Sequence, residues 1–488
     1  MDRVVDKGAT VRMSRLAWLA PPLAALVVHG RELGFGFTSL DDLTLIVADQ
    51  PFLQRPDAIR LAFGRAYFHV VDAAHSYYRP LVTASYALDA RLSGASPLGY
   101  HVTNLALHVG ATLLVLALLR RLAIGNGVAA CGALVFAVHP ALVEAVAWAP
   151  GRNDSLLTVF ALGAVVSFAR GSLVLHLACF AAALFSKETA LAVPSICLAY
   201  AWLVEPGAPA RAVRSRGRWV ALASGWALVT IAFALARARV LNGASGALDL
   251  RVALAHLPVL VTSLGKIALP VDLAVLATTD DSASWPGVIA AGAIAALVWR
   301  VRGVRVRVIA FGVALYVLAL VPVLFAPGSL ALESRLYLPS VGVLVVLAEL
   351  ADRLAVERRV VYAGAVAAAL ALAAIAFGYA GAFHDPHAFA KAAVLGSPHS
   401  SLAHFTLGQS HQLRGDLERA AGEYVFALAL DPREPLVHNN LAVIHMKRAA
   451  WIRADDELRK ELEVNPGCET AEKNLAVVTR RLDELRAE

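Results

Sequence analysis

Two adjacent carboxylates, Asp41 and Asp42, follow the first apolar segment of the chain, where a membrane-spanning helix is expected to reach water. A connection between two spans does not need an acidic pair at this point. Carboxylates at the mouth of a membrane cavity can act as a general base, bind a metal ion or cap a helix. We therefore treat Asp41 and Asp42 as candidate catalytic residues, and the sequence leaves all three roles open.

Three cations stand in other polar turns of the chain: Arg79, Lys187 and Arg335. An arginine can hold a phosphate through two parallel N–H bonds, whereas a lysine acts as a point charge. All three are candidates for binding the phosphate of a donor headgroup. For Lys187 a salt bridge with Glu188 at the membrane interface is an alternative, because such lysines often extend their charge towards water.

Four ionisable residues, His139, Glu144, Arg152 and Asp154, lie where one apolar run ends and the next begins. Ionisable groups at this depth of a bilayer are costly and need a reason. They can line a substrate site. Alternatively, Arg152 can form an internal pair with Glu144 or with Asp154 that braces the turn.

A polar stripe of His101, Asn104 and His108 recurs at helical spacing on the second apolar run. Hydrogen bonds between helices are its expected role. A metal site formed by the two histidines is disfavoured, because two helical turns separate them by about 10 Å. A divalent metal elsewhere in the site is left open, and no cofactor is assigned.

These motifs, together with the turn from Glu333 to Tyr337, define one set of residues expected to line a substrate site. The set is Tyr78, His101, Asn104, His139, Glu144, Arg152, Asp154, Glu188, Glu333 and Tyr337.

The composition indicates what must position these residues. The chain has 488 residues, of which 58% are hydrophobic and 17% charged, and a mean hydropathy of +0.63. This is too apolar for a soluble fold and predicts an all-α, multi-pass helical membrane protein. The net charge is +7, but the arginines occupy short loops between apolar runs, as is typical of membrane orientation signals. We expect the lipid bilayer as a partner, and no nucleic acid.

Eleven apolar runs are candidates for membrane spans of about 20 residues, some of them short enough to need packing against protein. They cover 15–36, 101–119, 127–149, 155–170, 171–186, 188–205, 219–236, 286–299, 308–326, 336–352 and 360–381. A further stretch, 253–276, is interrupted by Lys266, Pro270 and Asp272. It is either re-entrant or another span, so we expect about eleven to twelve spans.

Four short basic loops, at 120–121, 211–218, 300–307 and 353–359, predict the orientation. With a cytoplasmic N-terminus, the span count places all four in the cytoplasm. The same count places the polar turns together on the opposite face, where we expect one extracytoplasmic site. The Ala-, Arg- and Val-rich composition indicates a bacterial inner membrane with the site in the periplasm. In a eukaryote the equivalent is the lumen of the endoplasmic reticulum.

The connection from residue 38 to 100 is long for a helical membrane protein, and such loops usually carry function. Its two amphipathic pieces, near 56–71 and 80–92, suit helices lying at the headgroup level. We therefore expect a large first extracytoplasmic loop with interfacial helices.

The chain becomes polar after about residue 385 and shows a period of 34 residues, as in Ala420 and Pro432 followed by Ala454 and Pro466. This spacing is typical of tetratricopeptide helix pairs, in which prolines end the second helix. We expect a membrane domain over 1–384 and a short extracytoplasmic α-solenoid over 385–488. Its repeats lie near 401–434, 435–468 and, incomplete, 469–488.

One reaction uses all of these groups. In transfer of a sugar from a polyprenyl phosphate, a carboxylate deprotonates the acceptor hydroxyl and cations stabilise the departing phosphate. Two other functions remain as alternatives. The chain can be a membrane-anchored scaffold whose repeats recruit partners, or a transporter of lipid-linked sugars. A transporter favours broken helices near the membrane midplane, and only 253–276 is a candidate.

The motifs occur in a fixed order, with Asp41-Asp42 first and the repeats last. Between them stand Tyr78-Arg79-Pro80-Leu81, the segment from His139 to Asp154, Ser186-Lys187-Glu188 and Arg335-Leu336-Tyr337-Leu338-Pro339-Ser340. In this order they resemble the transmembrane and tetratricopeptide-repeat-containing O-mannosyltransferase family.

The resemblance implies a membrane glycosyltransferase of the GT-C fold. It implies a polyprenyl-phosphate sugar donor, with mannose as one sugar, and a protein or glycan acceptor. Asp41 or Asp42 would be the catalytic acid of the first loop, and Asp154 and Glu188 would be further acids of the site. The repeats would bind the acceptor or a partner protein, although the array is much shorter than in the eukaryotic members.

Overall fold

Helices account for nearly all of the regular structure. The computed structural model describes residues 15–70, 77–205, 216–241, 249–325 and 332–488, and within these ranges it contains no β-strand. The predicted all-α fold is therefore confirmed.

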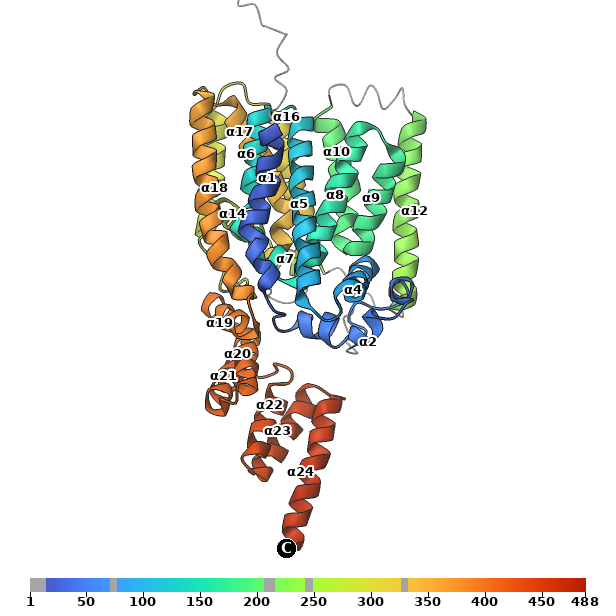
Figure 1. Cartoon of the computed structure of the whole chain (residues 1–488), viewed down its shortest axis with the longest axis vertical. Coiled ribbons are helices and arrows are strands. Elements are labelled where there is room, and N and C mark those ends of the chain that lie inside the picture. Colours follow the sequence, from blue (N-terminus) through green and yellow to red (C-terminus); the bar gives the residue numbers. More distant parts are fainter. Residues whose placement is uncertain (1–14, 71–76, 206–215, 242–248, 326–331) are drawn as a thin grey trace, which may run out of the picture.

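The helices of the membrane region stand roughly side by side (Figure 1). They are α1 (Arg15–His29), α5 (Pro97–Arg121), α6 (Asn126–Ala137), α7 (Val143–Ala147), α8 (Arg152–Arg170), α9 (Leu173–Ser186), α10 (Val193–Leu203), α12 (Arg216–Val240), α13 (Leu250–Ala255), α14 (Pro258–Ala268), α15 (Trp285–Arg300), α16 (Val306–Leu324), α17 (Tyr337–Arg353) and α18 (Arg358–Ala380).

Five segments of the described chain are long and apolar enough to cross a membrane: Pro97–Arg121, Arg216–Val240, Val306–Leu324, Glu333–Arg353 and Arg358–Phe383. The multi-pass membrane character is therefore confirmed. A bent pair, Asn126–Ala137 with Pro140–Ala147, is a sixth candidate, and the bend is 55°. Of the other predicted spans, 155–170 lies within the 19-residue α8. The spans 15–36, 171–186 and 188–205 contain α1, α9 and α10, which have 15, 14 and 11 residues, and 286–299 lies within the 16-residue α15.

Helices α16 and α17 approach each other closely at Gly312 and Gly342. A Cβ at Gly312 would lie 2.8 Å from the Gly342 carbonyl oxygen, and a Cβ at Gly342 would lie 2.5 Å from the Gly312 carbonyl oxygen. Only glycine permits this contact, which is typical of helix pairs in membranes. The pair forms a rigid wall that ends, towards the first loop, at the polar turn η6 (Glu333–Leu336).

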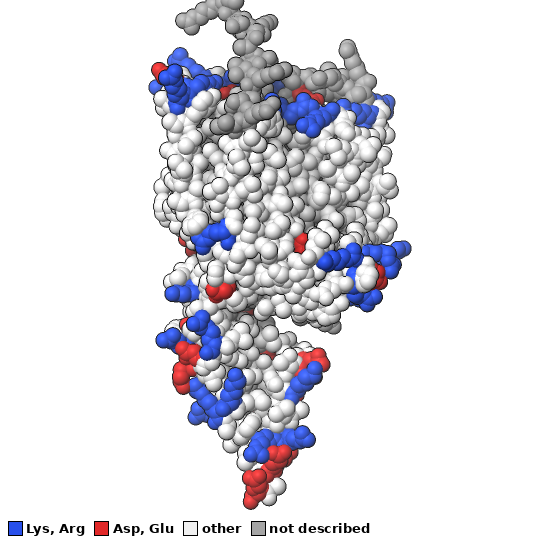
Figure 2. Space-filling view, in the orientation of Figure 1, with Lys and Arg blue, Asp and Glu red and all other residues white. Residues whose placement is uncertain are grey.

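Basic residues lie at both ends of the membrane region (Figure 2), and one group lies at the end that carries the start of α1. There Arg305 forms an ion pair with Glu349 and donates to the Leu122 carbonyl at 2.8 Å. Arg358 Nη1 lies 3.2 Å from Asp352 Oδ1. The basic loops at 120–121, 300–307 and 353–359 thus meet at one end, while most of the fourth, 211–215, lies outside the described residues.

The first loop covers the opposite end. It contains η1 (Gly30–Gly34), η2 (Leu43–Val47), α2 (Gln50–Leu53), α3 (Ala58–Ala62) and α4 (Pro80–Ser93). The predicted piece at 80–92 is α4, which packs on α5 and α9. The piece at 56–71 is helical only over α3, and residue 71 lies outside the described residues.

The C-terminal helices lie beyond this same end (Figure 1). They are α19 (Pro386–Gly396), α20 (Ser401–Leu413), α21 (Leu417–Leu430), α22 (Val437–Lys447), α23 (Trp451–Val464) and α24 (Glu469–Ala487). Helices α20 and α21 form one packed pair and α22 and α23 another. Gly408 faces the Tyr424 ring, where a Cβ would lie 2.5 Å from the ring, so the small residue permits the first pairing. His399 Nδ1 lies 2.6 Å from Asp281 Oδ1 and joins this region to the loop after α14.

Candidate functional site

A strained turn carries the two first-loop carboxylates. Leu40 has a φ of 60°, in the left-handed region that a residue other than glycine rarely adopts. Its carbonyl accepts hydrogen bonds from the N–H groups of Leu43 at 3.1 Å and Thr44 at 3.3 Å. Asp41 and Asp42, which follow Leu40 directly, lie in different surroundings.

Asp42 is held inside the protein. Its carboxyl Oδ2 accepts hydrogen bonds from the Thr38 backbone N–H and the Thr38 hydroxyl, both at 2.6 Å, and the residue is 1% exposed. Burial raises the pKa of Asp42 to about 7, and the neighbouring Asp41 acts in the same direction while the Thr38 bonds oppose it. This carboxyl group therefore holds the turn in place.

Asp41 is partly exposed and more open. Among the residues that the structure describes, none forms a hydrogen bond or ion pair with its carboxylate. Burial raises the pKa of Asp41 to about 6, and the positive charge of Arg79 opposes this shift. An available carboxylate with this pKa is well suited to accept a proton near neutral pH.

Arg79, at the start of α4, lies beside Asp41 and forms a two-pronged ion pair. Its Nη2 lies 2.6 Å from Glu188 Oε1 and its Nε 3.2 Å from Glu188 Oε2. The guanidinium also lies over the Tyr77 ring, 4.3 Å from the ring centre. Glu188 begins the short helix η5 (Glu188–Ala192), so this pair ties the first loop to the connection between α9 and α10.

Lys187 occupies the break between α9 and η5 and pairs with Asp154. Its Nζ lies 2.7 Å from both carboxyl oxygens of Asp154 and donates to Asn153 Oδ1 at 3.1 Å. Burial lowers the pKa of Lys187, Asp154 opposes this shift, and the positive charges of Arg79 and Arg335 reinforce it. The three predicted phosphate-binding cations therefore lie close together.

We name this group the open cluster. It consists of Asp41, Arg79, Asp154, Lys187, Glu188 and Arg335. Its three cations face three carboxylates, so the formal charges balance when all are ionised. The Arg79–Glu188 and Lys187–Asp154 ion pairs fix the positions of two cations. Asp41 is the carboxylate least engaged by other side chains.

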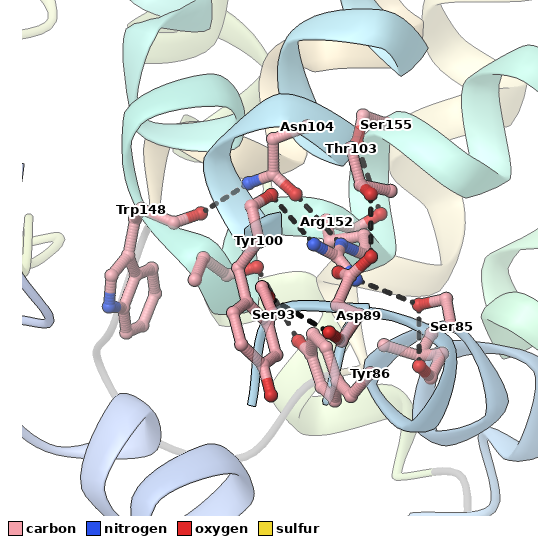
Figure 3. Close-up of polar contacts among 12 residues, drawn as sticks. Ser85, Tyr86, Asp89, Ser93, Tyr100, Thr103, Asn104, Trp148, Arg152 and Ser155 are labelled. Atoms are coloured by element: carbon pink, nitrogen blue, oxygen red, sulfur yellow. Dashed lines mark hydrogen bonds and ion pairs between the residues drawn. The ribbon is translucent and has the colours of Figure 1, made fainter. Parts of the chain in front are cut away.

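Arg152 has a different role, because it braces three helices (Figure 3). The side chain is 0% exposed. Its Nε donates to Asn104 Oδ1 at 2.8 Å and its Nη2 to the Tyr100 carbonyl at 2.7 Å. Its Nη1 lies 2.5 Å from Asp89 Oδ2 in an ion pair and 3.2 Å from Ser85 Oγ. The predicted pairs of Arg152 with Glu144 or Asp154 are wrong, since Asp89 on α4 is its acid.

The polar stripe on α5 largely joins helices. Asn104 donates to the carbonyls of Val146 at 3.1 Å and Trp148 at 3.0 Å. His108 Nδ1 lies 2.5 Å from the Tyr337 hydroxyl, which accounts for the predicted residue Tyr337 as well. His101 is buried and packs edge-on to Phe35, and neither ring nitrogen has a hydrogen-bond partner among the described residues.

Glu144 and Glu333 belong to a buried network beside the open cluster. Glu144 Oε2 accepts from the Ser334 backbone N–H at 3.0 Å. Glu333 Oε1 lies 2.9 Å from Lys266 Nζ, and its Oε2 accepts from the Tyr379 hydroxyl at 3.0 Å. Lys266, the residue that interrupts the predicted segment 253–276, is thus neutralised inside the protein.

The remaining predicted residues are held in the helix packing. His139 caps the turn after α6, where its Nδ1 accepts from the Ala141 N–H and its Nε2 lies 2.8 Å from the Ile267 carbonyl. Tyr78 donates to the Phe63 carbonyl at 2.8 Å. Neither residue reaches the open cluster through a described hydrogen bond.

Two residues that the motifs did not single out, Tyr67 and Asn153, lie at the open cluster. Burial raises the pKa of Tyr67 to about 12, and the charges of Arg79 and Asp41 influence it, so the phenol lies beside both. Asn153 bonds to Lys187 and stands between Arg152 and Asp154 in the sequence, which was a usable signal. No sequence signal marked Tyr67, because aromatic residues are common in amphipathic interfacial segments.

A metal site does not emerge from the described part of the chain. Within it, no three His, Cys, Asp or Glu side chains come together closely enough to hold an ion.

Comparison with known proteins adds a second line of argument. No family model matches the chain. Protein O-mannosyl-transferase Tmtc1 of Drosophila melanogaster is 38% identical over 200 residues, covering 39% of this chain and 23% of that protein. Protein O-mannosyl-transferase TMTC1 of Mus musculus is 34% identical over 227 residues, covering 41% and 24%. Protein O-mannosyl-transferase TMTC3 of Homo sapiens is 30% identical over 212 residues, covering 41% and 23%.

These alignments confirm the resemblance to the O-mannosyltransferase family that the motifs indicated. They span about a quarter of the length of the curated relatives. The similarity thus concerns a portion of each protein.

Proposed function

We propose that this chain is a membrane glycosyltransferase that moves a sugar from a polyprenyl phosphate to a hydroxyl group of a protein or glycan. The names of its relatives support a protein O-mannosyl-transferase activity and mannose as the sugar. The observation that carries the proposal is an available carboxylate, Asp41, beside Arg79, whose positive charge acts together with that of Arg335 on Lys187.

Asp41 acts as the general base in this proposal. The acceptor oxygen attacks the anomeric carbon of the sugar, its proton passes to the Asp41 carboxylate, and the bond between the sugar and the phosphate oxygen breaks. Asp42 positions Asp41, since it is only 1% exposed and its Oδ2 accepts both hydrogen bonds from Thr38. The choice between the two acids therefore rests on which one the acceptor can reach.

The cations stabilise the departing phosphate. The polyprenyl phosphate gains one negative charge as it leaves, and Asp41 loses one as it takes the proton. The net charge of the occupied cluster therefore stays constant, while negative charge moves towards Arg79, Lys187 and Arg335. Preorganised cations of this kind stabilise developing charge strongly in a site shielded from water. Glu188 and Asp154 hold two of the cations in position.

The distribution of basic residues supports the proposed orientation. In this orientation the end with Arg305 and Arg358 would face the cytoplasm, and Asp41 and α19–α24 would lie on the extracytoplasmic side. In a bacterial inner membrane this side is the periplasm. We assign 1–384 to a catalytic membrane domain of GT-C type and 385–488 to tetratricopeptide repeats. The paired helices α20–α21 and α22–α23 support the repeat assignment, and their place beyond the first loop suits binding of the acceptor or a partner protein.

A transfer assay tests the proposal. The full chain in lipid nanodiscs receives radiolabelled mannosyl phosphoundecaprenol or, in a parallel reaction, labelled GDP-mannose, together with a pool of extracted envelope proteins as acceptors. We expect label in protein from the lipid donor only, and none with the Asp41→Asn variant. Asp57→Asn is the matched control, because Asp57 is a partly exposed acid of the same loop that pairs with Arg55. Equal transfer by the wild type and Asp41→Asn, or transfer from GDP-mannose alone, would contradict the proposal.

A further inference from the structure

An apolar groove of about 620 Å³ lies between α14, α15, α16 and α17. Its floor is the contact of Gly312 with Gly342, and small residues of α15, Ala291 and Ala295, form one wall. The described lining residues are apolar apart from the Trp299 indole N–H and the Tyr316 hydroxyl, which donates to the Leu260 carbonyl. Ala295 and Val313 are exposed, so in a membrane the groove opens sideways to lipid. Its volume is in the usual range of ligand sites.

The groove continues towards the end of the membrane region that carries the first loop. The face of α16 that lines it through Val313 and Val317 continues, at helical spacing, to Leu320 and Val323. These last two residues line a second, much smaller pocket of about 10 Å³. The two hollows therefore follow one another along one face of α16.

The smaller pocket is polar. Its polar lining residues are Thr262, Ser263, Lys266, Ser282 and Arg335. Lys266 is paired with Glu333 and buried, and Arg335 is partly exposed, so Arg335 is the more accessible of the two cations. The pocket has room for a water-sized group only, so a larger anion would lie at its mouth. There an arginine and nearby hydroxyl groups could bind phosphate oxygens through charge-assisted hydrogen bonds.

Arg335 connects this pocket to the open cluster. Its positive charge reaches Lys187, which is paired with Asp154. A hydrocarbon groove, a polar mouth and the cluster around Asp41 thus lie in sequence. A lipid-linked sugar has the same order of parts, because its hydrocarbon chain ends in a phosphate and the phosphate carries the sugar.

We propose that the groove between α14, α15, α16 and α17 holds the hydrocarbon chain of the lipid-linked donor, with its phosphate at Arg335. The donor enters sideways from the bilayer, and its sugar projects towards Asp41. The identity of the donor as a polyprenyl phosphate rests on the proposed function. The location of the chain rests on the two hollows and their charges.

A second apolar groove provides an internal comparison. It has a volume of about 490 Å³ and lies between α6, α17 and α18. Its described lining residues include Leu354 and Val356, close to the basic end where Arg358 pairs with Asp352, and none of them is charged. This groove lacks a polar mouth near Asp41, so it suits ordinary membrane lipid.

Photolabelling tests the location. Undecaprenyl phosphate with a diazirine in its chain is incubated with the full chain in nanodiscs and irradiated, and the labelled peptides are identified by mass spectrometry. We expect label on α14–α17 and about tenfold less label on Ala295→Trp, a loss of about 1.4 kcal/mol in binding. The matched variant Ala365→Trp fills the other groove and should label as the wild type does. Undecaprenol, which lacks the phosphate, should compete less well than undecaprenyl phosphate.

Label concentrated between α6 and α18, or spread evenly over the lipid-facing helices, would overturn the inference. Because the probe carries no sugar, this result is independent of transfer. A labelled groove in a chain without transfer activity would refute the proposed function and keep the lipid site.

Kinetics give a second readout in an active chain. Ala295→Trp should raise KM about tenfold for the undecaprenyl donor, with little change for a donor of two isoprene units, which is too short to fill the groove. An active Ala295→Trp variant with wild-type KM for both donors would refute the groove and keep the proposed function. Thermal unfolding of both tryptophan variants checks that they are folded.

Discussion

Two charged clusters share one short segment of the sequence yet differ in character. Arg152 has no exposed surface, and its guanidinium is satisfied by Asp89, Asn104 and the Tyr100 carbonyl. Two residues later, Asp154 joins the open cluster, where Asp41 has no described hydrogen-bond partner. Residue type alone does not distinguish a charged cluster that stabilises the fold from one that can bind a substrate. The two roles differ in their hydrogen-bond partners. In a structural cluster the protein itself supplies a partner for every charged group, whereas a site leaves at least one charged group available to a ligand.

The largest expected effect comes from breaking the cluster around Arg152. Arg152→Met should leave Asp89 buried without a cation, which costs about 3–5 kcal/mol of folding free energy. We expect loss of the folded protein, measured by size-exclusion chromatography and thermal unfolding. Adding Asp89→Asn should restore part of the stability, because it removes the unpaired charge. A stable, active Arg152→Met protein would show that this cluster is not a brace.

The next effect concerns the open cluster. Lys187→Met should lower kcat for transfer by about 100-fold, as is typical when one group that stabilises a developing charge is removed. The folded protein should persist, because the described hydrogen bonds of the Lys187 side chain reach only Asn153 and Asp154 of α8, whereas Arg152 joins three helices. Transfer and thermal unfolding are measured on the same preparation. A drop in stability as large as that of Arg152→Met would instead indicate that Lys187 has a structural role.

The pH dependence of transfer sharpens the role of Asp41. Its pKa is raised to about 6, and a general base must be ionised to accept a proton. Transfer should therefore fall as the pH drops through 6, by about tenfold per unit below it. The measurement is kcat/KM from pH 4.5 to pH 8. A flat profile across this range would exclude a carboxylate with this pKa as the base.

The smallest expected effect concerns Asp42 and folding. Its pKa is about 7 in the folded protein against an ordinary value of 3.8. Between these values the folded state binds more protons than the unfolded state, so stability falls as the pH rises. Asparagine at this position can still accept the hydrogen bonds from Thr38, but it does not titrate and so adds no pH dependence to the stability. We expect Asp42→Asn to raise Tm relative to the wild type by about 2 °C at pH 8, and by less at pH 5. An equal difference at both pH values would contradict the buried titration.

Several features could be predicted from the sequence because they depend on local composition. The apolar runs identify the helices, and the family resemblance follows from the order of short motifs. The sequence also predicted that Arg79, Lys187 and Arg335 lie near one another. The number of predicted spans that precede each of their turns puts all three turns on the same side of the membrane.

The pairings within the site could not be predicted. Asp89 lies in an amphipathic segment with nothing to mark it as the partner of Arg152, 63 positions away. Lys266 interrupts an apolar run in the sequence, and the fold brings Glu333 beside it as a partner. Such contacts depend on how helices distant in sequence pack together. The difference between Asp41 and Asp42 likewise depends on the left-handed turn at Leu40, which no residue type there signals.

The most direct test of this account compares the two neighbouring acids in one assay. Asp41→Asn and Asp42→Asn are measured for single-turnover sugar transfer from the polyprenyl-phosphate donor, with thermal unfolding recorded on each. We expect Asp41→Asn to be folded and to lose at least about 1,000-fold in rate, while Asp42→Asn keeps measurable transfer. Wild-type rates in a folded Asp41→Asn protein would contradict the account.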